Sequence, residues 1–350
     1  MHSTARQNGR CPNRPAFTLV ELLVVMGVLA LMSSMVLVGL ASAAEQARVA
    51  RTRGQIQKIH ELLMTRWDEY RYRRVEPSKS GSVRARQGAR VDKIRELMRM
   101  EMPDRKEDFA YTNSGGSLVL ASRVSLSQDP ALYNRYKRQI IKQTGAADFN
   151  AALGSWSGAH ASSECLYMIL GSIQDGETNG LDYFKPSEIG DTDGDGMLEI
   201  LDAWGKPIYF LRWPYGFPIV ESIATSDGPR RDALTNLIDL NSTDPFDPLN
   251  VRGGASHPAL YPLIFSAGTD GLYNIRMTID KYQYGTQMMP DIDILCYSRL
   301  SNSPYVSDSD KSDPSETANP QDDRVGNIIN ADGGELDNIS NHVLVISGNG

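Results

Sequence analysis

An apolar block near the N-terminus constrains this chain more than any other feature. Residues 17–44 read FTLVELLVVMGVLALMSSMVLVGLASAA, 28 residues whose only charged side chain is Glu21. As a helix rising about 1.5 Å per residue the block is about 42 Å long, whereas the hydrocarbon core of a bilayer is about 30 Å thick. The sequence therefore predicts one membrane-spanning helix, and the remainder of the chain has to fold outside the bilayer.

The residues in front of the block indicate how this anchor is processed. Residues 1–16, MHSTARQNGRCPNRPA, contain three arginines and no acidic side chain, and the small residue Ala16 directly precedes the block. A secretory signal instead has its small-residue cleavage site after a shorter apolar core. The reversed order predicts a cut on the cytoplasmic side that leaves the helix on the mature protein. The arginines favour a cytoplasmic N-terminus, but four basic residues between Arg48 and Lys58 follow the helix, so charge alone does not decide its orientation.

Ala16 followed by FTLVELLVV resembles the prepilin signature of type IV pilins and of type II secretion pseudopilins. In that family a membrane prepilin peptidase cuts after a small residue, commonly Gly, and methylates the new terminal amine, commonly that of Phe. The resemblance implies cleavage between Ala16 and Phe17 and N-methylation of Phe17, with Ala16 departing from the commoner Gly. It also implies assembly with other pilin or pseudopilin subunits by secretion or pilus machinery at the inner (cytoplasmic) membrane.

Glu21 is the residue on which we expect assembly to depend. An unpaired carboxylate inside an apolar helix costs several kcal/mol, and no basic side chain lies within helical reach of it in the block. In the family that the chain resembles, the glutamate at this fifth mature position is thought to pair with the terminal amine of an adjacent subunit and to set the register of assembly. We expect that pairing for Glu21; the alternative is a carboxylate that reaches the cytoplasmic headgroups.

The helical pattern continues beyond the block as an amphipathic segment, residues 45–76. Its apolar residues recur every three or four positions, which predicts one buried stripe on a charged helix. The stripe is made of Val49, Ile56, Ile59, Leu62, Leu63 and Trp67. Pro77 and the run SKSGS end the pattern. The sequence thus predicts a single helix of about 55–60 residues, with a membrane half and a half that packs on the head.

The remaining residues predict a head of mixed structure. Residues 77–184 are expected to be a helical insertion, with helices near 86–102, 129–143 and 160–173. In residues 185–300 short apolar runs lie between Pro and Gly, a pattern typical of strands; they are PIYFLRW, FPIVES, YPLIFSA and DIDILCY. Residues 301–350 are expected to be a flexible segment rich in Asp, Ser and Asn, in which NHVLVISG is a candidate final strand.

These assignments give an α+β fold class. We expect a pilin-like architecture in which a long N-terminal transmembrane and amphipathic helix packs on a C-terminal head with extra helices and a small antiparallel β-sheet. Cys11 lies upstream of the block, so Cys165 and Cys296 are the cysteines left to the head. Whether they form a disulfide or stay two buried thiols is left open.

Charge is distributed unevenly along the chain. The formal net charge is -7, yet residues 45–106 contain 17 Lys and Arg against 9 Asp and Glu, and the chain beyond Gly171 is rich in Asp. A basic stretch can bind nucleic acid or anionic lipid. We favour a solvated helix face over a nucleic-acid partner. A third alternative is that the basic part of one subunit faces the acidic part of the next.

Residues 191–202, DTDGDGMLEILD, have the pattern of a calcium loop. Such a twelve-residue loop supplies oxygen ligands from positions 1, 3, 5, 7, 9 and 12, with Gly at position 6 for the turn. The expected ligands are Asp191, Asp193, Asp195, the backbone carbonyl of Met197, Glu199 and Asp202. Asp at the last position resembles dockerin-type loops, and Pro207 argues against the long exiting helix of an EF-hand. We expect a structural calcium ion; the alternative is an acidic glycine turn without one.

Two later segments extend the resemblance. DAWGKPIYF (202–210) and SAGTDG (266–271) are similar to segments in the C-terminal part of type II secretion major pseudopilins, a family that also uses calcium in its C-terminal loops. Inserts rich in Asp and Pro stretch the spacing in this chain. These segments favour a pseudopilin over the other filament subunits.

No arrangement of residues indicates catalysis. The five histidines are scattered without an HExxH motif, GSWSG has Trp156 where a nucleophile would stand, and there is no glycine-rich phosphate loop. We therefore expect no enzyme but a structural subunit of a type II secretion-like pseudopilus, a periplasmic filament for protein export, with its head in the periplasm. The alternatives are a type IV (minor) pilin for adhesion, motility or DNA uptake, and a membrane-tethered calcium-binding lectin or adhesin.

Overall fold

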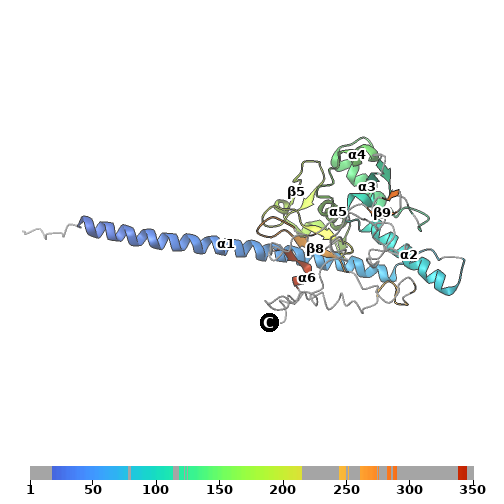
Figure 1. Cartoon of the computed structure of the whole chain (residues 1–350), viewed down its shortest axis with the longest axis horizontal. Coiled ribbons are helices and arrows are strands. Elements are labelled where there is room, and N and C mark those ends of the chain that lie inside the picture. The colour runs from blue at the N-terminus through green and yellow to red at the C-terminus, as the bar shows by residue number, and fades with distance from the viewer. Residues whose placement is uncertain are drawn as a thin grey trace, which may run out of the picture. The chain divides into compact units, whose positions relative to one another are not determined.

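The fold is given by a computed structural model of the whole chain (Figure 1). The structure describes residues 18–77, 80–112, 118–121, 123, 125–214, 244–249, 251, 261–273, 275, 282–284, 287–289 and 338–344. The chain divides into two compact units, Met1–Ala47 and Arg48–Gly350.

A single long helix, α1 (Leu19–Glu69), begins in the first unit and ends in the second, and a 3-10 turn at Tyr70–Tyr72 follows it. This confirms the predicted helix, which is 51 residues long rather than 55–60. It ends before Pro77 because the backbone becomes extended at Arg73 (φ -62°, ψ 129°). In the first unit every described residue from Thr18 to Ala44 is exposed, and by length and composition the helix can cross a membrane.

Within the second unit the predicted apolar stripe of α1 is buried. Ile56, Ile59, Leu63 and Trp67 have no exposed surface, and they join the main hydrophobic core of the unit. Val49 is partly buried against the same core. The period of three and four residues therefore located the packed face of this helix correctly.

Four further helices make up much of the second unit: α2 (Val83–Glu101), α3 (Ala131–Thr144), α4 (Phe149–Ser155) and α5 (Ala161–Leu170). The sequence predicted all but α4. At α2 the hydroxyl of Ser82 accepts a hydrogen bond from the Ala85 amide, so it satisfies one of the unpaired donors at the helix start. Shorter 3-10 turns lie at Lys106–Asp108, Gly180–Tyr183 and Pro186–Glu188.

The strands are short and pair antiparallel. A three-stranded sheet has β8 (Leu263–Ser266) at its centre, between β7 (Tyr209–Leu211) and β11 (Ile339–Ser340), and Phe210 stands opposite Ile264. Among the described residues the other pairs are β1 (Ala110–Thr112) with β2 (Leu118–Leu120), β3 (Gln174–Asp175) with β4 (Thr178–Asn179), β5 (Ile189–Gly190) with β6 (Glu199–Ile200), and β9 (Tyr282–Tyr284) with β10 (Gln287–Met289). The predicted α+β class with a small antiparallel sheet is confirmed.

The candidate final strand in NHVLVISG is wrong for the part that the structure describes. Residues Asn341–Leu344 form a helical turn, α6, directly after β11. The side chain of Asn341 accepts a hydrogen bond from the Ile264 amide (2.8 Å) and donates one to the Pro262 carbonyl (2.9 Å). These bonds take up the backbone groups of β8 that a longer strand would use. The predicted strands in FPIVES and DIDILCY lie outside the described residues.

One main core joins the helices and the sheet. It contains Trp156 and residues of α5 together with Phe210 and Ile264 from the three-stranded sheet. A smaller cluster, made of Tyr209, Leu211, Leu263, Phe265 and Ile275, covers the other face of β7 and β8. The predicted helical insertion and the predicted strand region thus share one core. Cys165 of α5 is a buried free thiol, whereas Cys296 lies outside the described residues.

Candidate functional site

The start of α1 places Glu21 in a local hydrogen-bond arrangement with Thr18. The Glu21 carboxylate accepts from the Thr18 amide (2.9 Å) and hydroxyl (3.0 Å), and the Glu21 amide donates to the Thr18 hydroxyl oxygen (3.2 Å). This reciprocal pattern is a capping box, and its T-x-x-E signature is present in the sequence. At the start of its own helix Glu21 therefore has a polar partner, Thr18, although no basic side chain of the apolar block is in reach. Ala16 and Phe17 lie outside the described residues.

The apolar surface around Glu21 is continuous. The large hydrophobic side chains from Leu19 to Leu40 are between about half and four-fifths exposed. A patch of this size is not stable in water, and within a bilayer a helix is the form that satisfies its own backbone groups. This surface therefore requires lipid or other apolar helices around it.

A second candidate site is the acidic loop between β5 and β6. Two glycines with positive φ, Gly194 (79°) and Gly196 (93°), turn the chain. A Cβ at Gly196 would lie 2.7 Å from the backbone oxygen of Gln143 in α3, so only glycine fits there. The glycines of the DTDGDG motif are thus required both by the turn and by its contact with α3.

The loop brings together the three aspartates that the sequence identified. Asp191, Asp193 and Asp195 each offer a carboxylate oxygen within 4.8 Å of those of the others. The same side chains hold the loop: the Asp191 carboxylate accepts from the amides of Gly194 (2.7 Å) and Gly196 (3.0 Å). Bonds of this kind occur in Asp-rich turns with or without an ion, so they do not by themselves identify a metal site.

The other predicted ligands are placed differently. Asp202 has no atom in this group, because its carboxylate accepts from the amides of Trp204 and Lys206 (both 2.9 Å) and from the Ser266 hydroxyl (2.6 Å). It fixes the turn that leads into β7, which differs from its expected role as the last ligand of the loop. The Met197 side chain is fully buried in the core, and no contact identifies its carbonyl as a ligand.

The structure adds one acidic residue that the loop pattern did not contain. Glu164 of α5 is fully buried, and an oxygen of its carboxylate lies within 4.8 Å of carboxylate oxygens of Asp193 and Glu199. Glu199 is also fully buried, and the amide of Thr192 donates to it (3.0 Å). The sequence signal for Glu164 was a single acid inside the apolar run ASSECLYMIL, which carried no spacing relation to the loop.

Burial makes the charged forms of Glu164 and Glu199 unfavourable. Desolvation raises the pKa of Glu164 to about 8, against the hydrogen bond from the Trp156 indole, which lowers it. Desolvation likewise raises the pKa of Glu199 to about 7, against the Thr192 amide. Neighbouring carboxylates raise both values further. Such a group needs protons or a cation to neutralise it.

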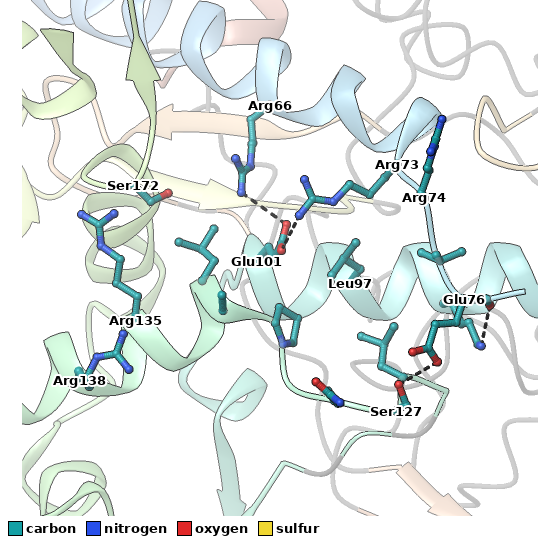
Figure 2. A pocket seen from close by; sticks show the side chains of 17 residues that line it. Arg66, Arg73, Arg74, Glu76, Leu97, Glu101, Ser127, Arg135, Arg138 and Ser172 are labelled. Atoms are coloured by element: carbon teal, nitrogen blue, oxygen red, sulfur yellow. Dashed lines mark hydrogen bonds and ion pairs between the residues drawn. The ribbon is translucent and has the colours of Figure 1, made fainter. Parts of the chain in front are cut away.

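A basic pocket lies elsewhere in the second unit (Figure 2). Its volume is about 660 Å³, and six basic residues line it against two acidic ones, Glu76 and Glu101. The basic residues are Arg66, Arg73, Arg74, Lys93, Arg135 and Arg138. Figure 2 shows Arg66 and Arg73 directed at the buried Glu101, at 3.4 and 3.2 Å. Four of these residues belong to the basic stretch at residues 45–106, whereas Arg135 and Arg138 come from α3. The surplus of positive charge is compatible with an acidic partner.

Comparison with known proteins identifies one segment. Residues 11–37 match the family model of the prokaryotic N-terminal methylation motif. No curated protein and no solved structure matches the chain. The matched residues enclose the predicted cleavage position, the start of α1 and its capping box.

Proposed function

We propose that this chain, a type IV pilin-like protein by its N-terminal methylation motif, is a structural filament subunit that is cut between Ala16 and Phe17 and anchored by α1. The observation that carries the proposal is the matched motif on an apolar helix whose surface is exposed from Leu19 to Leu40. Prepilin peptidase is the processing partner, and other pilin-type subunits are the assembly partners. The role is structural rather than catalytic.

Within this class we propose a subunit of a type II secretion-like pseudopilus, with its head in the periplasm. The support is the pair of segments 202–210 and 266–271, which resemble parts of major pseudopilins. They are neighbours in the fold, because the Ser266 hydroxyl donates to Asp202 (2.6 Å) and β7 pairs with β8. Two segments far apart in sequence thus form one local unit, as expected if they descend from one pseudopilin head.

We also propose that the loop at 191–199 holds a structural calcium ion. Oxygen ligands in flexible geometry suit this hard cation, and three aspartates of the loop lie within 4.8 Å of one another. The ion neutralises carboxylates that otherwise repel one another and so stabilises the loop against α3 and α5.

Intact mass of the membrane-extracted protein tests the assignment. The expected mass lacks residues 1–16 and includes one added methyl group on Phe17. A protein that begins at Met1, or one that loses the whole apolar helix on export, would contradict it. An Ala16→Leu variant is the matched control, because a bulky residue before the cut should leave the precursor unprocessed in the membrane.

A deletion strain separates the pseudopilus from the type IV pilus. If the proposal is right, exported proteins accumulate in the periplasm of the strain while surface pili are unchanged. Loss of surface filaments with normal export would instead identify a type IV pilin.

A further inference from the structure

Glu164 has a buried carboxylate oxygen that the fold leaves without a partner. Its Oε2 accepts a hydrogen bond from the indole Nε1 of Trp156, but its Oε1 has no hydrogen-bond partner in the described part of the chain. The residue has no exposed surface. A buried acceptor in this condition costs about 1–3 kcal/mol, and more when it is charged. Glu164 nevertheless lies in the first turn of α5, with its side chain in the core.

The carboxylate of Glu164 meets two others from the acidic loop. One oxygen from each of Glu164, Asp193 and Glu199 lies within 4.8 Å of the other two. Calcium binds oxygen at about 2.3–2.6 Å, so two ligands on opposite sides of one ion are about 4.6–5.2 Å apart. Separations within 4.8 Å are compatible with three oxygens of one calcium coordination shell.

Positive charge near the three carboxylates is scarce. Within the described residues none of them forms an ion pair with Lys or Arg. Lys106 acts on Glu164 and Asp195 electrostatically, but its ammonium group donates to the backbone carbonyl of Trp156. Lys106 also acts on Glu107, so in the described part of the chain its single charge is shared among several carboxylates.

The remaining contacts orient the three side chains toward one point. The Trp156 indole donates to Oε2 of Glu164, the Ser157 hydroxyl donates to Asp193, and the Thr192 amide donates to Glu199. The second oxygens of Asp193 and Glu199 accept only long hydrogen bonds, from the Asp195 amide and the Thr192 hydroxyl (both 3.4 Å), and each keeps a lone pair for a ligand. Within the described residues the Oε1 of Glu164 has both lone pairs available. Hydrogen bonds of this kind typically fix metal ligands in position.

We propose that Glu164 is a calcium ligand and that the ion binds between α5 and the loop, held by Glu164, Asp193 and Glu199. The inference rests on the proposed calcium ion and changes its position. Asp191 and Asp195 keep the loop folded through their backbone contacts, and Asp202 has no part in the site. The ion then ties the β5–β6 loop to the helix at the centre of the core.

Calcium titration of the full-length protein in detergent, stripped with EDTA, tests this arrangement by calorimetry. Glu164→Gln should lower calcium affinity at least about tenfold, because a charged ligand is lost. Asp191→Asn should lower it less than Glu164→Gln. The matched control is Glu177→Gln, which replaces an exposed acid on the β3–β4 turn. This variant should bind calcium as the wild type does.

Thermal unfolding in EDTA shows whether a variant is folded. Glu164→Gln keeps an acceptor for Trp156 and removes a buried charge, so its melting temperature in EDTA should equal or exceed that of the wild type. Should it unfold, Glu199→Gln provides the same test of the site.

Wild-type affinity in Glu164→Gln, with binding lost in Asp191→Asn, would overturn the role of Glu164 and leave the ion within the loop. A wild-type protein that binds no calcium would remove both calcium proposals. Neither result would affect the processed, membrane-anchored subunit, which the mass measurement tests separately.

Discussion

His342 is a single residue whose burial makes the stability of the head depend on pH. It has no exposed surface, and its Nε2 lies 3.3 Å from the carbonyl oxygen of Pro262. Desolvation lowers its pKa to about 3, with the charge of His60 acting in the same direction and the Pro262 carbonyl against it. The ordinary value is about 6.5, so the unfolded chain takes up a proton that the folded chain excludes.

The sign of the effect follows from this depressed pKa. Stability due to neutral His342 is fully present above pH 6.5 and is lost as the pH falls toward 3. Between pH 7 and pH 5 the contribution of His342 falls by about 2 kcal/mol of unfolding free energy. The raised pKa values of Glu164 and Glu199 change the stability in the opposite direction over the same range, so the His342 contribution is the difference between the wild type and a His342 variant. Denaturant unfolding of the detergent-extracted protein at both pH values measures it.

His342→Gln should remove the His342 contribution, so that its stability changes between pH 7 and pH 5 by about 2 kcal/mol more favourably than that of the wild type, because glutamine can donate to Pro262 but does not titrate. His160→Gln is the control. His160 contacts the Tyr209 hydroxyl (2.7 Å), and its replacement should leave the change in unfolding free energy between pH 7 and pH 5 as it is in the wild type. If the unfolding free energy changed equally between pH 7 and pH 5 in His342→Gln and in the wild type, His342 would not be the source of the pH dependence.

Individual site residues could be predicted only where chemistry and spacing lie in the same short segment. The three aspartates of the loop belong to one motif and do converge. Glu164 comes from helix α5, and only tertiary packing brings it to Glu199 in the loop. Asp202 fitted the twelfth position of the pattern, but Ser266, 64 residues later, takes its second oxygen. Contacts over such separations leave no local trace in the sequence.

At the scale of elements, Arg212 at the end of β7 connects the sheet with the end of α2. Its guanidinium is 1% exposed; it donates to the Met102 carbonyl (2.6 Å) and pairs with Asp108 (3.0 Å). Its amide donates to the carboxylate of Asp104 (2.9 Å). Burial raises the pKa of Asp104, but Arg105 and Arg212 outweigh it and lower the pKa to about 2.

Arg212→Met should therefore destabilise the head by about 3–5 kcal/mol, because it removes the ion-pair partner of the buried Asp108 and leaves the buried Asp104 with Arg105 alone. Adding Asp108→Asn to this variant should restore part of the loss. Arg123→Met is the control: its pair with Asp129 (3.2 Å) is partly exposed, so its removal should cost less than about 1 kcal/mol. Denaturant midpoints measure all four proteins, and equal losses in the two arginine variants would refute the network.

Helices and strands were predictable where apolar residues recur at a regular spacing and Pro or Gly marks the ends of the element. The stripe of α1 and the ranges of α2, α3 and α5 followed from apolar spacing and from Pro and Gly. The seven residues of α4 are too few for a period to be recognised. The paired strands of two or three residues, such as β5 and β6, exist because their loops return the chain onto itself, and Asn341 converts a predicted strand into a helical turn through its bonds to β8.

At the scale of the whole molecule, the proposed function requires one copy of the chain to pack against another. The apolar surface of α1 from Leu19 to Leu40 contains one acid, and the capping box with Thr18 gives that acid a partner inside its own chain. Thr18 satisfies the hydrogen-bonding capacity of Glu21 but leaves its charge in place. A helix packed among other apolar helices still requires a cation for that charge.

Glu21→Val tests whether assembly needs a cation paired with the charge of Glu21. We expect the variant to be cut and methylated normally, since Ala16 and Phe17 are unchanged, but to be absent from filaments, because the terminal amine of a neighbouring subunit loses its partner. Filaments sheared or extracted from cells, together with intact mass of the membrane fraction, measure incorporation and processing in the same sample.

Thr18→Val is the decisive control, because it removes the capping box and keeps the carboxylate. If Glu21 acts between subunits, Thr18→Val still assembles, with at most a modest loss from a weaker helix start of about 1 kcal/mol. If Glu21 serves only to begin its own helix, the two variants fail alike. Normal incorporation of Glu21→Val would exclude both roles and leave the apolar surface of α1 as the sole determinant of assembly.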